Sequence, residues 1–190
     1  MRRKADPGAE ADAPFVGSLP GRIILTGFMG TGKTSIGLAL ARAVKRPFVD
    51  LDRVIESSEG KSVAEIFARD GEGGFRAIEA REASRVARLP GTVIATGGGT
   101  LLFDPARDAL LDDGARVFVL TASTDVLEKR LAPIRAHRPM LAGGDLRERI
   151  DALLAERAPR YAALGETIDT SERAVPDVVA EILARLGVVA

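Results

Sequence analysis

A glycine-rich stretch at 27–34 constrains what this chain can fold into more than any other part of the sequence. It reads GFMGTGKT, follows an apolar run at 23–25, and opens a segment whose apolar residues recur at helical spacing. A strand, a glycine loop and a helix in that order are the setting of a phosphate-binding P-loop. The alternative is an ordinary glycine-rich turn with an incidental lysine, for which neither this spacing nor this setting is needed.

The residue types in the stretch match the chemistry of a triphosphate. Glycines let backbone N–H groups face an anion without side-chain obstruction, and the predicted helix adds the positive end of its dipole. Lys33 supplies a point charge for the outer phosphates, and Thr34 offers a hydroxyl to Mg²⁺. We therefore expect a purine nucleoside triphosphate as the ligand.

Composition excludes several other kinds of site. Lys plus Arg and Asp plus Glu number 27 each, so no net field favours nucleic acid or an anionic membrane. The chain has no Cys and a single His, His137, which excludes thiolate and histidine metal sites and leaves a hard ion held by oxygens. No apolar run approaches the roughly 20 residues of a membrane span, and no apolar signal core follows Met1. These features predict a cytoplasmic protein.

The chain divides into a short leader and one domain. Residues 1–20 carry charges and prolines without periodicity, which predicts a flexible leader. From 21 to 190, short apolar runs alternate with helical patterns, which predicts a single α/β domain with a parallel sheet and helices on both faces. The expected strands lie at 23–25, 48–49, 93–95, 117–120 and 167–169, and helices are expected after the glycine loop and at about 62–69, 75–89, 104–111, 125–131, 145–161 and 176–186.

Polar motifs follow two of the expected strands. Asp50 and Asp52 come after one, and Gly97, Gly98 and Gly99 after another, so both should share one rim with the glycine loop. In an extended segment the two carboxylates project to the same side, one toward Mg²⁺ and the other toward an acceptor hydroxyl. The alternative is two acids that merely decorate a helix N-terminus. The triple glycine offers unobstructed N–H groups to a ligand, or is an ordinary strand-to-helix turn.

Two arginines stand out by position. Arg157 continues the apolar stripe of the helix expected at 145–161, so it should face inward, where a charge needs a partner. Arg76 lies three residues before Glu79, which can hold its guanidinium while a fork stays free for a ligand. For each, the alternative is a structural ion pair or a snorkelling side chain.

Taken in order and at nearly the right intervals, these motifs resemble those of the shikimate kinases over about residues 21–188. The glycine loop alone indicates only a P-loop, whereas the later motifs are highly specific in combination. They are GFMGTGKT at 27–34, DLD at 50–52, DGE at 70–72, FRAIE at 75–79, GGG at 97–99, RPML at 138–141 and ERAPRY at 156–161.

The resemblance implies a three-layer P-loop kinase fold of the nucleoside-monophosphate-kinase type, with a five-stranded parallel sheet and a mobile lid at about 133–144. It also implies ATP- and Mg²⁺-dependent phosphorylation of the 3-hydroxyl of shikimate, on the route to chorismate and the aromatic amino acids. A monomer is expected.

The resemblance also implies roles for individual residues. Asp52 would bind the shikimate hydroxyls; since an aspartate of ordinary pKa is a weak base at neutral pH, we expect it mainly to orient the attacking hydroxyl. Arg76 and Arg157 would clamp the carboxylate, and Arg138 would swing in from the lid. The implied sets are Asp52, Lys33 and Arg138 for catalysis; Asp52, Arg76, Gly97, Gly98, Gly99 and Arg157 for substrate; Gly30, Thr31, Gly32, Lys33, Thr34, Ser35 and Arg138 for the nucleotide; and Thr34 and Asp50 for the metal.

The sequence departs from the family pattern near the lid. The segment 130–138 is about one residue longer than expected, so Arg130 and Arg135 are both candidates to stack on adenine. Arg173 lies one step from a position where some members contact the nucleotide. His137 is expected on the lid surface, without a catalytic role.

Two other functions are compatible with a P-loop. A kinase of another small hydroxy acid such as gluconate should lack the combination of Arg76, the triple glycine and Arg157. A nucleotide-binding switch should carry an Asn-Lys-x-Asp element, which is absent, and a silent relative should have lost Asp52, Lys33 or Arg138, all of which are present.

Overall fold

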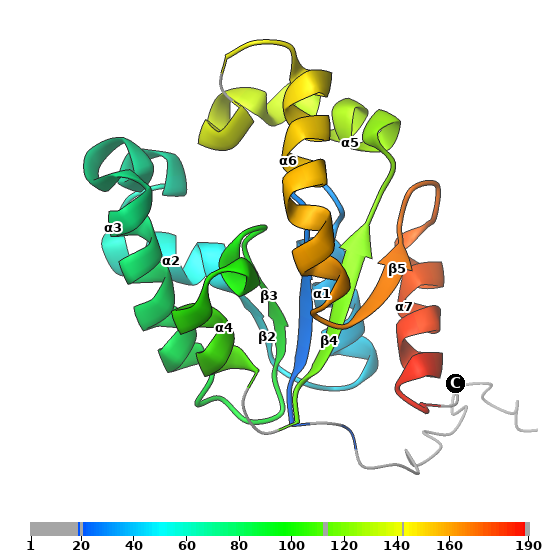
Figure 1. The fold of residues 1–190 in the computed structure, drawn as a ribbon. Coiled ribbons are helices and arrows are strands. Elements are labelled where there is room, and N and C mark those ends of the chain that lie inside the picture. The colour runs from blue at the N-terminus through cyan, green and yellow to red at the C-terminus, as the bar shows by residue number, and fades with distance from the viewer. Residues whose placement is uncertain (1–18, 20, 112–113, 142, 189–190) are drawn as a thin grey trace, which may run out of the picture.

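The fold is built on one five-stranded sheet (Figure 1), as seen in a computed structural model that describes residues 19, 21–111, 114–141 and 143–188. Neighbouring strands are all parallel. The predicted leader at 1–20 lies almost wholly outside the described residues, whereas the expected five-stranded parallel sheet is confirmed. The order is β2-β3-β1-β4-β5, formed by β1 (Ile23–Gly27), β2 (Phe48–Asp50), β3 (Val93–Ala95), β4 (Arg116–Thr121) and β5 (Glu166–Asp169).

The central strand β1 explains why the molecule has three layers. Every residue of β1 is buried, and its side chains alternate between two hydrophobic clusters. Ile24 packs in one cluster, while Ile23 and Leu25 pack in the other. Because both faces of a parallel sheet of this kind are apolar, helices must cover both.

Helices cover the two faces unequally. One face packs against α1 (Lys33–Ala43) and α7 (Val175–Arg185). Figure 1 shows α4 and α6 in front of the other face and α3 beside α4, away from α1 and α7. The helices that contribute to this second cluster are α2 (Leu51–Glu59), α3 (Val63–Val86), α4 (Asp104–Leu110), α5 (Thr124–Leu131) and α6 (Leu146–Ala162).

The connections determine where a ligand can bind. The chain runs from β1 past β3 to reach β2, and from β3 past β1 to reach β4. The connection after β1 and the connection after β3 therefore leave in opposite directions. This leaves a crevice at the carboxyl ends of these two neighbouring strands. The glycine loop follows β1 and the triple glycine follows β3, so both lie at that crevice.

Helix α2 was not expected, and it corrects the geometry predicted for Asp50 and Asp52. Asp50 ends β2 and is the N-cap of α2, with its side chain accepting a hydrogen bond from the backbone N–H of Arg53 at 3.4 Å. Asp52 lies in the first turn of that helix. The two carboxylates thus leave the backbone in different directions, because the chain turns into a helix between them.

Helix α3 covers the two helices expected at 62–69 and 75–89. It spans Val63–Val86 and consists of two helical parts that meet in a kink at Gly71, whose φ of 68° and ψ of −174° are not helical. The expected break is therefore present, but it is shorter than the loop predicted at 70–74, because residues 72–74 are already helical. Ser62 and Glu65 form a capping box at its start. In Figure 1 the first part of α3 lies at the upper left, to the side of the sheet, and the second part runs down beside α4.

The predicted lid at 133–144 contains two 3₁₀ helices, Ala132–His137 and Pro139–Leu141. The guanidinium of Arg135 donates hydrogen bonds to the carbonyls of Leu141, Gly143 and Gly144 at 3.0, 2.8 and 2.7 Å. The segment also packs on the rest of the molecule, because Leu141 is buried in the cluster of the second face. Its mobility remains a prediction. Across the described ranges, none of the helices is long and apolar enough to cross a membrane.

Candidate active site

The glycine loop ends in an uncapped helix N-terminus. Gly32 is the N-cap of α1 in a left-handed conformation, with φ of 90°, and no side chain caps the helix. Its first turn contains no acidic residue. Free N–H groups and the positive end of the dipole therefore remain available for an anion.

Lys33 folds back over the loop. Its Nζ donates hydrogen bonds to the carbonyls of Gly27 and Phe28 at 2.9 and 2.8 Å. Burial lowers the pKa of Lys33 to about 8; Arg138 also lowers it, while Asp52 and Asp50 oppose the shift. A buried ammonium of this kind gains from a phosphate beside it.

Thr34 and Asp50 bring two hard oxygen atoms together beside the loop. The Thr34 hydroxyl donates to Asp50 Oδ2 at 2.7 Å. Within the described ranges, no group of three or more acidic or histidine side chains could hold a metal by itself. One carboxylate and one hydroxyl fit Mg²⁺, which takes its remaining ligands from phosphates and water.

A cavity next to the loop brings together the residues predicted for the acceptor. It is lined from α2 by Asp52, from α3 by Arg76, from the lid by Arg138 and from α6 by Arg157, with the triple glycine between them. The whole lining consists of Met29, Asp52, Val63, Phe67, Phe75, Arg76, Glu79, Gly97, Gly98, Gly99, Arg138, Met140 and Arg157.

The triple glycine allows these side chains to approach the end of β3. A Cβ at Gly97 would lie 2.9 Å from Asp52 Oδ1, and one at Gly99 would lie 2.7 Å from Arg76 Nη2. Any larger residue at these positions would have to displace a predicted substrate-binding group. Tyr161 donates its hydroxyl proton to the Gly98 carbonyl and fixes the loop from the side of α6.

Arg76 is held by two carboxylates. Its Nη1 pairs with Glu79 at 2.6 Å and its Nη2 with Glu72 at 3.2 Å. Glu79 is only 1% exposed and also accepts a hydrogen bond from the Thr100 hydroxyl at 2.7 Å. The expectation that Glu79 restrains Arg76 is confirmed, whereas the second terminal nitrogen, expected to stay free for a ligand, pairs with Glu72.

Arg157 faces inward as expected, with 6% of its surface exposed. Its guanidinium carbon lies 6.0 Å from the centre of the Phe28 ring. Over the ranges that the structure describes, no carboxylate forms an ion pair with it. A buried cation in a cavity without a carboxylate partner indicates that an anion belongs there.

Asp52 does not have the ordinary acidity assumed from the sequence. Burial raises its pKa to about 6; Asp50 adds to the shift, and Lys33 opposes it. The premise that this aspartate is an unshifted, weak base was therefore wrong, because its helix position buries the carboxylate. A carboxylate of this pKa can accept a proton more readily than an exposed one.

A second cavity lies on the other side of the glycine loop, and two of the three arginines proposed for adenine contact line it. Arg130 donates to the carbonyls of Gly30 at 3.1 Å and Thr170 at 2.9 Å. Arg173 donates to the Asp169 carbonyl at 3.2 Å. The side chain of His137 lies outside the described residues. The cavity is lined by Gly30, Thr31, Gly32, Ser35, Ile36, Arg130, Thr170, Arg173, Val175 and Val178.

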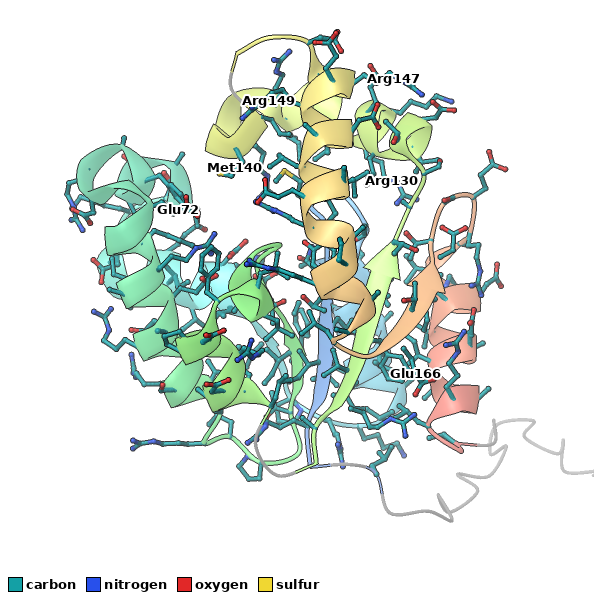
Figure 2. All side chains as sticks on the ribbon, in the orientation of Figure 1. Glu72, Arg130, Met140, Arg147, Arg149 and Glu166 are labelled. Atoms are coloured by element: carbon teal, nitrogen blue, oxygen red, sulfur yellow. The ribbon has the colours of Figure 1, made fainter. Side chains whose placement is uncertain are left out.

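Several lining residues were not predicted for the site. Phe67 stacks on Phe75, with ring centres 4.5 Å apart, and forms part of an apolar wall with Val63. Met140 reaches the cavity from the lid; Figure 2 places it between α6 and α3. Their sequence signal was apolar spacing alone, which does not distinguish a cavity wall from a core.

The chain is similar to known proteins over most of its length. A family model described as shikimate kinase matches residues 29–187. A shikimate kinase from Symbiobacterium thermophilum is 45% identical over 86% of this chain and 95% of the relative.

Two solved structures have the same fold. A shikimate kinase from Acinetobacter baumannii in complex with shikimate is 33% identical, with a TM-score of 0.83 over 89% of this chain and 93% of the other. One from Bacteroides thetaiotaomicron is 35% identical, with a TM-score of 0.80 over 88% and 99% of the two chains. With a matching family model over most of its length and relatives of this similarity, the chain belongs to the shikimate kinase family.

Proposed function

We propose that this kinase transfers the γ-phosphoryl group of ATP to the 3-hydroxyl of shikimate in the presence of Mg²⁺, on the route to chorismate. The observation that carries the proposal is the buried Arg157, which has no carboxylate partner in the described residues and shares a cavity with Asp52 and Arg76. Such a cavity suits an acceptor with one carboxylate and neighbouring hydroxyls. The glycine loop beside it suits the phosphoryl donor.

The triphosphate would lie along the loop. The N–H groups from Gly30 to Ser35 would bind its oxygens, and Lys33 would exchange its two carbonyl partners for the outer phosphates. Thr34 and Asp50 would hold Mg²⁺, which neutralises phosphate charge when bound.

The acceptor would be held at both of its ends. Arg76 and Arg157 would bind the carboxylate, which fixes the ring, while Asp52 would orient the attacking hydroxyl and accept its proton. The apolar wall with Phe67 would pack against the ring. Phosphoryl transfer depends mainly on such alignment and on charge neutralisation.

The lid would complete the site. Arg138 lines the cavity from the segment 133–144 and lies close enough to Lys33 and Asp52 to influence the pKa of both. It would contact the transferring phosphate once the lid closes. Closure would also exclude water, which would otherwise compete as the acceptor.

Of the three arginine candidates, Arg130 and Arg173 are the proposed neighbours of the purine, because they line the cavity beyond the loop. Arg135 is instead engaged with carbonyls of the lid.

The direct test measures ADP release with ATP and Mg²⁺ across shikimate, gluconate and nucleoside monophosphates. We expect turnover with shikimate alone. Preference for gluconate would assign the chain to a related reaction, and ATP binding without transfer to any acceptor would identify a silent relative.

A single substitution tests the clamp. Arg157→Ala should lower kcat/KM for shikimate by roughly ten- to hundred-fold, since a charged hydrogen bond contributes about 1.5–3 kcal/mol, and should leave ATP binding near normal. Arg147→Ala is the matched control, because Arg147 lies on the same helix and pairs with Asp125 and Glu128 of α5 (Figure 2). Unchanged kinetics in Arg157→Ala would remove the clamp assignment.

A further inference from the structure

Phe103 is a surface aromatic residue without a role in the core. It lies between the 3₁₀ helix Thr100–Leu102 and α4, and 36% of it is exposed. It belongs to neither of the two hydrophobic clusters, even among their partly buried neighbours. A contact outside these two clusters must therefore account for the position of the ring.

That contact is with Arg76. The guanidinium carbon lies 4.1 Å from the centre of the Phe103 ring, closer than the 5.3 Å to the ring of Phe75. At this distance the ring attracts the cation through its negative face. The Arg76 side chain is only 16% exposed, and its Nε is buried without a hydrogen-bond acceptor. Stacking on Phe103 compensates part of that burial.

Stacking supplies a restraint that the carboxylates do not. Glu79 and Glu72 pair with the terminal nitrogens of Arg76 and so fix its edges. A ring 4.1 Å from the guanidinium carbon limits movement of the group toward Phe103 and keeps water away on that side. A charge in a drier site attracts an opposite charge more strongly.

We propose that Phe103 is a positioning residue that holds the Arg76 guanidinium in the orientation that receives the carboxylate of the acceptor. This inference builds on the proposed function, in which Arg76 binds that carboxylate. Phe103 itself is absent from the lining of the acceptor cavity, so it acts through Arg76.

A purely structural role makes a different prediction. If Phe103 only supported the start of α4, its loss would lower stability and would affect the two substrates alike. If it positions Arg76, its loss should affect only the acid.

The experiment compares Phe103→Ala, Phe103→Leu and Phe103→Tyr with the wild type by steady-state kinetics and by the Kd for shikimate without nucleotide. Phe103→Ala should raise the KM and Kd for shikimate about three- to tenfold, with kcat and the KM for ATP within about twofold. Phe103→Tyr should restore both values, because it keeps the ring. Leu89→Ala, at a surface leucine that is 46% exposed, is the control for loss of an exposed apolar side chain.

Two outcomes would overturn the inference: an unchanged KM for shikimate in Phe103→Ala, or full function in Phe103→Leu, which is apolar but has no π face.

Arg76→Ala distinguishes failure of this inference from failure of the proposed function. If Arg76→Ala raises the KM for shikimate and Phe103→Ala does not, only the positioning role is wrong. If Arg76→Ala also leaves the KM for shikimate unchanged, the assignment of Arg76 to the carboxylate clamp is wrong. In the double variant, Phe103→Ala should add no further loss.

Discussion

Asp50 and Asp52 are separated by one residue, yet the turn into α2 gives them different surroundings. Asp50 caps the helix and accepts a hydrogen bond from Thr34, whereas Asp52 faces the acceptor cavity. The two negative charges repel each other when no cation lies between them. Lys33 interacts electrostatically with both carboxylates, so its ammonium offsets this repulsion.

Replacing Asp52 with asparagine tests the residue that is proposed to accept the proton. Asp52→Asn keeps the size of the side chain but removes its charge and most of its basicity. Turnover should fall by about a hundredfold or more, while nucleotide affinity stays near that of the wild type. Single-turnover kinetics and a nucleotide titration measure the two effects. Asp108→Asn, at an exposed carboxylate of α4, is the control, and near-normal turnover in Asp52→Asn would refute the role.

Some single residues were predictable from the sequence, and others were not. Arg157 could be placed inward because it continues the apolar stripe of its own helix. Thr100 and Phe103 could not be assigned, because their partners Glu79 and Arg76 lie on α3, more than 20 residues earlier in the chain. Local patterns show which way a side chain faces, but not which distant group it meets.

Among the elements, α3 shows how one glycine can shape a site. Gly71 adopts φ of 68° and ψ of −174°, a region that is essentially restricted to glycine. The bend leaves Val63 and Phe67 on one side and Arg76 on the other, and all three line the same cavity. A straight helix would not bring both parts of α3 to one ligand.

Two glycines near the bend offer a matched comparison. Gly71→Ala should lower the free energy of unfolding by about 1–3 kcal/mol through backbone strain, although open space surrounds the added methyl group. Gly73→Ala, also in open space but without positive φ, should raise it by about 0.5–1 kcal/mol. Urea denaturation of both variants measures the difference. Equal effects would show that the bend carries no strain.

The elements were largely predictable where apolar spacing was regular, as in the five strands and in α6. Helix α2 was missed because polar residues dominate its exposed side and its start coincides with a motif that we interpreted as extended. The break in α3 was predictable from the glycines at 71, 73 and 74, but its length was not. In the structure, the non-helical backbone within α3 is confined to Gly71, and the helix resumes directly after it.

At the scale of the whole molecule, an alternating chain of charges connects β4, β5 and α7 to the nucleotide side of the loop. Glu166 accepts from Arg116 and Arg185, and Glu181 accepts from Arg185 and Arg173. Arg173 lines the cavity proposed for the purine. This series of ion pairs therefore runs from β4 to a residue that lines the cavity proposed for the purine.

Removing Glu181, one of the two acids in this series of ion pairs, should make stability less dependent on pH. Hydrogen bonds from Arg173, and then Arg185, hold the pKa of Glu181 below its ordinary 4.5. Its contribution is therefore present above pH 4.5 and disappears as pH falls through the lower pKa of the folded state. Glu181→Gln should lower the free energy of unfolding by about 0.2–1 kcal/mol at neutral pH. Urea denaturation at neutral pH and at about pH 3 measures the change. A difference between variant and wild type that is the same at both pH values would contradict the prediction.

The opposite directions in which the chain leaves β1 and β3 separate two kinds of chemistry along the gene. Asp52, Phe67, Arg76 and Glu79 all fall in one uninterrupted stretch between β2 and β3, whereas the donor loop precedes that stretch. Exchange of this stretch alone would therefore rebuild one wall of the acceptor cavity and leave both the glycine loop and the cation of Arg157 in place.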